Sequence, residues 1–115
     1  MLSMIDFLVI QNRGDDVKCD AGGPSKKGGK FVAWINLYNY GEYHRPVLNT
    51  NDIFDSAEQA ISWAERFVNA IRTEPEVELF EENIPAEKWA RMEKIINEVV
   101  ALEEKLAEAE QGEKP

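Results

Sequence analysis

The side chains best suited to acid–base or nucleophilic chemistry are few and scattered along this chain. His44 is the only histidine, so no second imidazole can complete a metal site. Cys19 is the only cysteine, and it lies in a glycine-rich stretch with no base beside it. Asp15, Asp16 and Asp20 lack the spacing and the terminal glutamate of a calcium loop. We therefore expect no enzymatic activity, no catalytic residue, no bound metal and no cofactor.

A run of glycines and lysines, A-G-G-P-S-K-K-G-G-K at residues 21–30, has the composition of an anion-binding loop. Glycine lets backbone amides approach a phosphate, and Lys26, Lys27 and Lys30 supply positive charge. The run is not closed by Gly-Lys-Ser/Thr, and no helix follows it directly, so it does not match the phosphate loop of nucleotide hydrolases. The simpler interpretation is a solvated hairpin loop.

Aromatic residues gather just after this loop, beside a histidine and an arginine. On the sheet face away from the helix, such a group would stack a base or anchor a protein partner. The simpler interpretation is packing between strands, with the tryptophan covered by the second helix. The members are Trp34, Tyr38, Tyr40, Tyr43, His44 and Arg45. Together with the loop they define an alternative ligand-binding set: Lys26, Lys27, Lys30, Tyr40, Tyr43 and Arg45.

Negative charge is concentrated in the second half of the chain. Residues 1–50 carry a net charge of +1 and residues 51–115 a net charge of −10. A chain this acidic is not attracted to nucleic acid as a whole, but it can bind a basic surface of another protein. A solvated surface is the simpler interpretation, although lysine and arginine are too few to balance the acid. The densest group is Glu74, Glu76, Glu78, Glu81 and Glu82, the predicted partner-binding set.

Cellular location is indicated by the cysteine count and by the first residues. A single cysteine excludes an intramolecular disulfide and fits a reducing cytosol. The opening residues 1–10 lack a positive region, and Asp6 interrupts the apolar run, so we expect neither a signal peptide nor a membrane span. The prediction is a cytoplasmic protein that does not enter a membrane.

The element that organises the chain is a helix over residues 56–71. Its apolar residues recur at spacings of three and four and form one continuous stripe. Asp55 and Ser56 are overlapping N-cap candidates, with Glu58 or Gln59 as the reciprocal partner. A helix with this stripe must pack against an apolar surface.

That surface is predicted to be a sheet. Residues 31–38 alternate as a strand, residues 39–42 form a turn, and residues 43–49 return at an edge or with a bulge because of Pro46. Residues 4–11 and residues 77–80 also suggest strands. We expect the long stretch of residues 12–30 to be largely irregular, apart from a short extension of the hairpin arms around residues 17–19.

A second helix is predicted over residues 84–110, opening at Pro85. It carries two neighbouring apolar stripes, which is more than one side of a helix can bury on a small sheet. We therefore expect a homodimer, formed through the apolar residues that remain exposed. These are Ile95, Val99, Leu102 and Leu106.

The predicted fold class is α+β: an antiparallel β-meander packed by one amphipathic helix and followed by a long C-terminal helix. Residues 1–83 form the sheet and first helix, residues 84–110 the long helix of the same domain, and residues 111–115 a frayed tail. Over residues 30–72, the strand pair followed by a capped, acidic-faced helix resembles small sheet-plus-helix modules such as HicB-type antitoxins.

Three functions are consistent with these patterns. The first is a small acidic, non-enzymatic adaptor or inhibitor that occupies a basic surface on a partner protein. In composition the chain is similar to the small acidic proteins that phages use against host nucleic-acid-binding machines, such as anti-CRISPR proteins. The second is a nucleotide- or nucleic-acid-binding module that uses the lysine–glycine loop and the nearby aromatics. The third is an antitoxin-like regulator.

Overall fold

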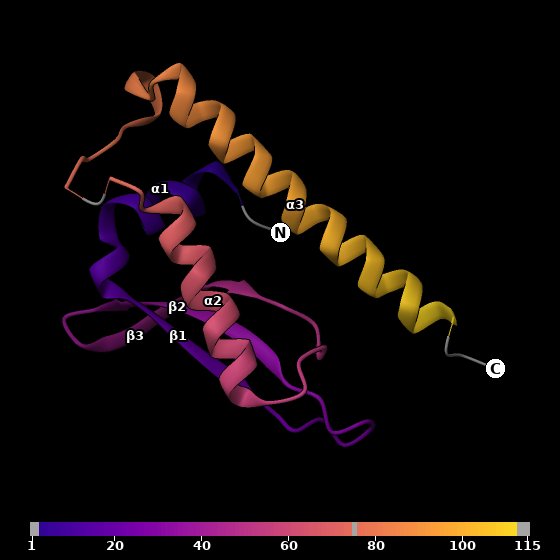
Figure 1. Cartoon of the computed structure of the whole chain (residues 1–115). Coiled ribbons are helices and arrows are strands. Elements are labelled where there is room, and N and C mark those ends of the chain that lie inside the picture. The colour runs from indigo at the N-terminus through magenta and orange to yellow at the C-terminus, as the bar shows by residue number, and fades with distance from the viewer. Residues whose placement is uncertain (1–2, 75, 113–115) are drawn as a thin grey trace.

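The α+β class predicted from the sequence is confirmed by the computed structural model, which describes residues 3–74 and 76–112 (Figure 1). The helices lie on one side of a three-stranded antiparallel sheet, and the last of them is the long C-terminal one. In chain order the elements are α1 (Met4–Arg13), η1 (Gly14–Asp16), β1 (Val17–Gly22), β2 (Val32–Asn39), β3 (Glu42–Asn49), α2 (Ala57–Ile71), η2 (Glu81–Asn83) and α3 (Ala86–Gly112).

The sheet has the order β1-β2-β3, so β2 is central and both neighbours are edge strands. The turn between β2 and β3 is tight, as predicted. Tyr40 and Gly41 both have positive φ, at 51° and 82°, as a type I′ hairpin turn requires. Pro46 lies on the edge strand β3, where its missing N–H breaks no ladder. Beside it, Val47 is an extra residue in the pairing, so both Val47 and Leu48 enter the core.

Helix α2 begins as its cap residues predict. The Ser56 hydroxyl accepts a hydrogen bond from the Gln59 N–H, at 3.1 Å. The Gln59 side chain accepts in return from the N–H of Asp55, one residue before the cap. Its apolar stripe, including Ala60, Ala64 and Val68, is buried against the sheet.

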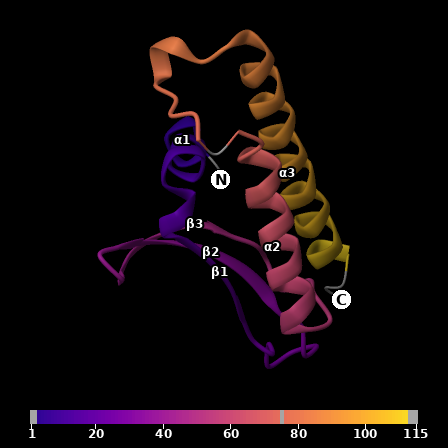
Figure 2. The same ribbon diagram turned by 60° about the vertical axis from the view of Figure 1, so that its left-hand side comes forward.

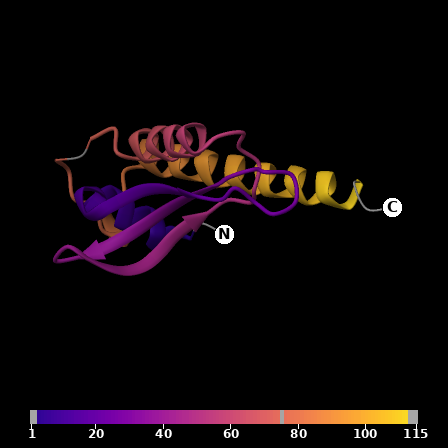
Figure 3. The ribbon, with the colours of Figure 1, turned by 90° about the horizontal axis from the view of Figure 1, so that it is seen from below.

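The core lies between one face of the sheet and the helices (Figure 2). In Figure 3 the strands lie below α2 and α3, so both of these helices are on the same side of the sheet. Alternate β2 residues supply the inward side chains Ala33, Ile35 and Leu37, as the period-two pattern predicts. The other face of the sheet is left open and carries several aromatic side chains.

Residues 4–11 form the helix α1, so the predicted strand is wrong. Ser3 and Asp6 make a capping box: the Ser3 hydroxyl accepts from the Asp6 N–H, and the Asp6 carboxylate accepts from the Ser3 N–H. Phe7 and Ile10 are buried on one side of the helix, whereas Ile5 faces solvent. A helical stripe and a cap therefore prevail over the β propensity of the branched residues.

The stretch of residues 12–30 is more regular than predicted. It holds the end of α1, η1 and the six-residue strand β1, which pairs antiparallel with β2 along its full length. Of this strand, the sequence predicted only a short extension of the hairpin arms around residues 17–19. The irregular loop is thus confined to the residues between Gly22 and Val32.

Helix α3 packs against the other helices through one stripe, and Met92, Ile95 and Val99 belong to the common core. Ile95 and Val99 are only 8% and 5% exposed within the single chain, so the expectation that they form an exposed apolar patch is wrong. The side chains of Leu102 and Leu106 lie outside the described part of the structure. Of the predicted frayed tail, residues 111–112 are helical, and residues 113–115 lie outside the described residues.

Candidate functional site

The predicted acidic set lies on the connection between α2 and α3, which we call the acidic strap (residues 74–83, described except for residue 75). All of its glutamates are exposed: Glu74, Glu76, Glu78, Glu81 and Glu82. Among the described residues, the ion pairs are Arg13–Asp16, Lys30–Asp55, Arg45–Asp6 and Arg72–Asp15, and none includes a strap glutamate. The strap therefore presents to solvent carboxylates that take part in none of these ion pairs.

The first part of the strap is held by the side chain of Gln11, near the end of α1. Gln11 is fully buried, and its Nε2 donates to the carbonyl oxygens of Glu74 and Val77, both at 2.9 Å. A buried amide that spans residues this far apart in sequence ties the strap directly to the core. Gln11 was not anticipated as a site residue, because residues 4–11 resembled a strand.

The second part of the strap is held by the neighbouring side chain, Asn12. Its Nδ2 donates to the Leu79 carbonyl oxygen at 2.7 Å, and the Leu79 N–H donates to Asn12 Oδ1 at 2.9 Å. The side-chain amide thus makes the pair of bonds that a neighbouring strand would make. Residues 77–80 are extended but form no strand, so the strand predicted there is wrong. Their hydrogen-bond partner is the Asn12 side chain and not a neighbouring strand. Polar residues at the end of an amphipathic helix were the only sequence signal for this contact.

Apolar side chains alternate with the acids along the strap. Leu79 points inward and is buried, which anchors the segment. Val77 and Phe80 are 39% and 50% exposed, so two apolar groups stand among the glutamates. An exposed aromatic within a polar rim is the usual composition of a protein-binding hot spot.

The ends of the strap are fixed at the helices it connects. Lys88 of α3 is buried, and its Nζ donates to the Ile71 carbonyl oxygen at the C-terminus of α2, at 2.6 Å. Burial lowers the pKa of Lys88, and the nearby Arg91 lowers it further, against an opposing effect of Glu74. The Arg91 side chain also donates to Thr73 Oγ1. Both helix ends are therefore joined just before the strap begins.

The lysine–glycine loop does not form an open anion cradle. Ser25 uses its own oxygens to close the loop: its carbonyl accepts from the Gly29 N–H at 3.2 Å, and its hydroxyl accepts from the Lys30 N–H at 3.0 Å. The Lys30 ammonium is paired with Asp55. Two backbone amides and one lysine of the proposed cradle thus already have partners within the chain.

The aromatic group lies on the open face of the sheet. Lys18 Nζ is 4.5 Å from the centre of the Tyr38 ring, and the Tyr38 and Tyr43 rings meet edge-on at 6.0 Å. Trp34 is 37% exposed, so the expectation that the second helix covers it is wrong; α3 packs with the core on the other face. Its indole instead lies over Gly22, where a Cβ would come within 2.3 Å of Trp34 Cζ2.

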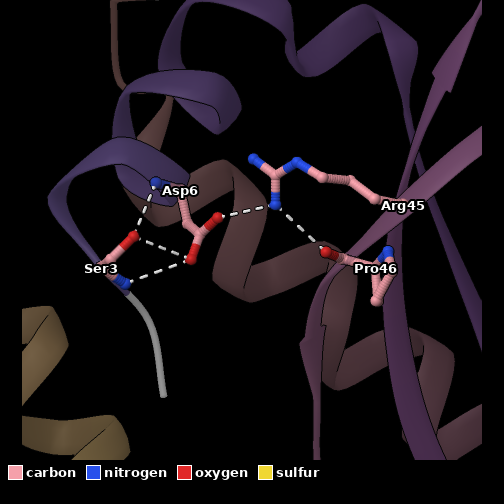
Figure 4. Close-up of polar contacts among 4 residues, drawn as sticks. All are labelled: Ser3, Asp6, Arg45 and Pro46. Atoms are coloured by element: carbon pink, nitrogen blue, oxygen red, sulfur yellow. Dashed lines mark hydrogen bonds and ion pairs between the residues drawn. The ribbon is translucent and has the colours of Figure 1, made fainter.

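Arg45 is turned away from the open face, toward helix α1. Its Nη1 lies 2.9 Å from Asp6 Oδ1 and also donates to the Pro46 carbonyl oxygen at 3.2 Å (Figure 4). Asp6 thus joins the cap of α1 to strand β3.

The alternative ligand-binding set is divided between the two ends of the sheet. The loop lysines precede β2, whereas Tyr40 and Tyr43 lie at the turn that follows it. An eight-residue strand is roughly 26 Å long at 3.3 Å per residue. One small ligand cannot contact both ends.

The side chains suited to catalysis remain apart in the fold. Cys19 is half-buried on β1, and burial, with a smaller effect of Glu65, raises the pKa of its thiol to about 11. This environment disfavours the thiolate that a nucleophile requires. Within the part of the chain that the structure describes, no group of three or more His, Cys, Asp or Glu side chains is placed to hold a metal ion.

Comparison with protein-family models, curated proteins and solved structures gives no match for this chain. Of the helices in residues 3–74 and 76–112, none combines the length and apolar character needed to cross a bilayer.

Proposed function

We propose that this protein is a non-enzymatic binding protein that uses the acidic strap to occupy a basic surface on a partner protein. The observation that carries the proposal has two parts: five exposed glutamates that belong to none of the ion pairs among the described residues, and a backbone held by hydrogen bonds from Gln11 and Asn12. A surface that is merely solvated would not require these hydrogen bonds from Gln11 and Asn12, which we call the clamp.

The clamp supports binding because it reduces the conformational entropy lost on association. A loop of similar composition without fixed hydrogen bonds would have to order at the moment of binding. Gln11 and Asn12 hold the backbone at Glu74, Val77 and Leu79 in the free protein. The strap is thus prepared for contact before a partner arrives.

Charge and apolar groups have different roles in the proposed contact. The exposed glutamates accelerate association and select basic surfaces, and they contribute less to final affinity. Val77 and Phe80 provide the apolar area that is removed from water in the complex. The complementary partner surface has lysines or arginines around an apolar pocket.

A cytoplasmic inhibitor of a nucleic-acid-binding protein is one form of this function, because such partners carry basic surfaces. An antitoxin-like regulator is another. The alternative of a nucleotide- or nucleic-acid-binding module is not proposed. Its loop is closed by Ser25, Lys30 is paired with Asp55, and its lysines and tyrosines lie at opposite ends of β2.

Panning a random peptide display library against the immobilised full-length chain tests the proposal. We expect the selected peptides to be rich in lysine and arginine and to contain a large apolar residue. Reversing the strap charges should abolish retention of these peptides. The strap variant replaces Glu74, Glu76, Glu78, Glu81 and Glu82 by lysine.

A matched control variant separates the site from the net charge. It replaces five exposed glutamates on helices by lysine, which changes the net charge by the same amount: Glu58, Glu87, Glu93, Glu98 and Glu104. The proposal predicts that this control keeps most of the selected peptides. Equal retention by the strap variant and the control, or selection of peptides without basic residues, would contradict it.

A further inference from the structure

Within the described part of the chain, no strand pairs with the outer edge of β1. In the sheet order β1-β2-β3, this edge faces away from β2. The Ala21 N–H donates to the neighbouring Asp20 carboxylate, at 2.8 Å. Its partner in register, Ala33, directs both its N–H and its carbonyl oxygen to Thr50 on the β3 side.

These contacts fix which β1 residues direct their backbone groups outward. In an antiparallel ladder, residues alternate between those that exchange hydrogen bonds with the neighbouring strand and those that do not. Ala21 does not exchange hydrogen bonds with β2. Cys19 and Val17 lie two and four residues before it, so they do not exchange hydrogen bonds with β2 either. The N–H and C=O groups of these three residues point away from β2.

Three registers pair β1 with an antiparallel copy of itself and keep Cys19 opposite an outward residue, and the charges on the strand favour one of the three. In the new strand pair, a residue with outward backbone groups must lie opposite another such residue of the second copy. Cys19 can therefore lie opposite Cys19, Val17 or Ala21 of the second copy. With Cys19 facing itself, Lys18 stands opposite the partner's Asp20, and the same pair recurs by symmetry. A shift by two residues in one direction sets Asp20 against itself, and in the other direction Lys18 against itself.

We propose that two copies of this chain form a symmetric dimer by antiparallel pairing of β1 with β1, with Lys18 of each copy opposite Asp20 of the other. The strand's charge pattern selects its own copy, because opposite charges directly across a strand pair stabilise it and like charges destabilise it. The sheet then becomes six-stranded, and its open face continuous. This interface replaces the one expected on α3, where Ile95 and Val99 are already buried.

The helix side of the edge has room for the second strand. A hollow of about 320 Å³ lies between β1 and α2. Its lining includes Val17 and Cys19 from the strand and Glu65, Asn69 and Arg72 from the helix. Glu65 lies near the two-fold axis and would approach its own copy, so we expect Glu65→Gln to strengthen the dimer.

The test is the mass of the full-length chain by light scattering, over concentrations from about 1 to 500 μM at low salt. We expect the wild-type chain to be a dimer in the upper part of this range. K18D and D20K each set like charges opposite one another twice, and should weaken the dimer roughly tenfold or more. The double variant K18D/D20K exchanges the two charges and should restore it.

Mixing the two single variants gives the sharpest result. K18D carries aspartate at both positions and D20K carries lysine at both, so a pair made of one of each has only opposite charges across the edge. We expect two weakly associating proteins to form a heterodimer when mixed. Circular dichroism checks that each variant is folded.

Two outcomes overturn the proposal. One is a wild-type chain that stays monomeric throughout the concentration range. The other is a dimer with the same stability in K18D, in D20K and in the double variant, which would locate the interface elsewhere. If a monomeric chain bound an extended peptide that K18D no longer bound, the edge would be a peptide site and not a dimer interface.

Discussion

Replacing Gln11 by methionine and Asn12 by alanine together is expected to reduce the free energy of unfolding by about 3–5 kcal/mol. The two side chains make four hydrogen bonds to the strap backbone, and three carbonyl oxygens and one N–H lose their partners in the variant. Each bond contributes about 1 kcal/mol, and each buried group left without a partner costs about 1–3 kcal/mol. Methionine preserves the volume of the buried Gln11 side chain, so the variant opens no large cavity at that position.

Urea denaturation measures the change in stability, and hydrogen exchange at the Leu79 amide reports the release of the strap. As a control, Asn69 and Asn97, which are exposed amides on α2 and α3, are replaced by alanine. Such surface changes usually alter stability by no more than about 0.5 kcal/mol. A loss below about 1 kcal/mol in the clamp variant, with unchanged exchange at Leu79, would show that the strap is held by other contacts.

Replacing Val77 and Phe80 by serine is expected to weaken binding of a strap-selected peptide roughly 100-fold, with little change in stability. Both side chains are substantially exposed in the free chain, so their removal opens no cavity. In a complex, an aromatic group that fills a pocket commonly accounts for about 2 kcal/mol or more. Isothermal titration calorimetry with the peptide measures the loss.

An exposed apolar residue elsewhere provides the matched control for this variant. Ile5 is 67% exposed on α1, and Ile5→Ser removes comparable apolar area away from the strap. We expect the affinity of this control to stay within about twofold of the wild-type value. Equal losses in the two variants would mean that general surface hydrophobicity, and not the strap, binds the peptide.

The elements that were predictable from sequence are those specified by local patterns. Helix α2 has its own cap at Ser56 and a complete apolar stripe, and β2 alternates cleanly. The turn at Gly41 was predictable because glycine readily adopts the positive φ that a tight hairpin turn requires. Each of these signals lies within a few residues of the structure it determines.

The elements that were missed depend on distant partners. Strand β1 has little pattern of its own, and its register is set by the pairing of Cys19 with Ile35. Branched residues in α1 favour a strand locally, but burial of Phe7 and Ile10 against the other helices favours the helix. The candidate site likewise has a part that local sequence predicts and a part that depends on distant residues. The acid of the strap is visible in composition, whereas its clamp joins Asn12 to a residue 67 positions later and follows only from the fold.

The role of the strap in binding is tested most directly by NMR of the backbone and side-chain amides of the chain during titration with a strap-selected peptide. We expect the largest shift changes at residues 76–82 and at the side-chain amides of Gln11 and Asn12. We also expect binding to weaken as salt is raised, because exposed charges are screened beyond about 8 Å at physiological ionic strength. Changes concentrated in residues 23–31 or around Trp34 and Tyr43, with residues 76–82 unmoved, would contradict this role of the strap.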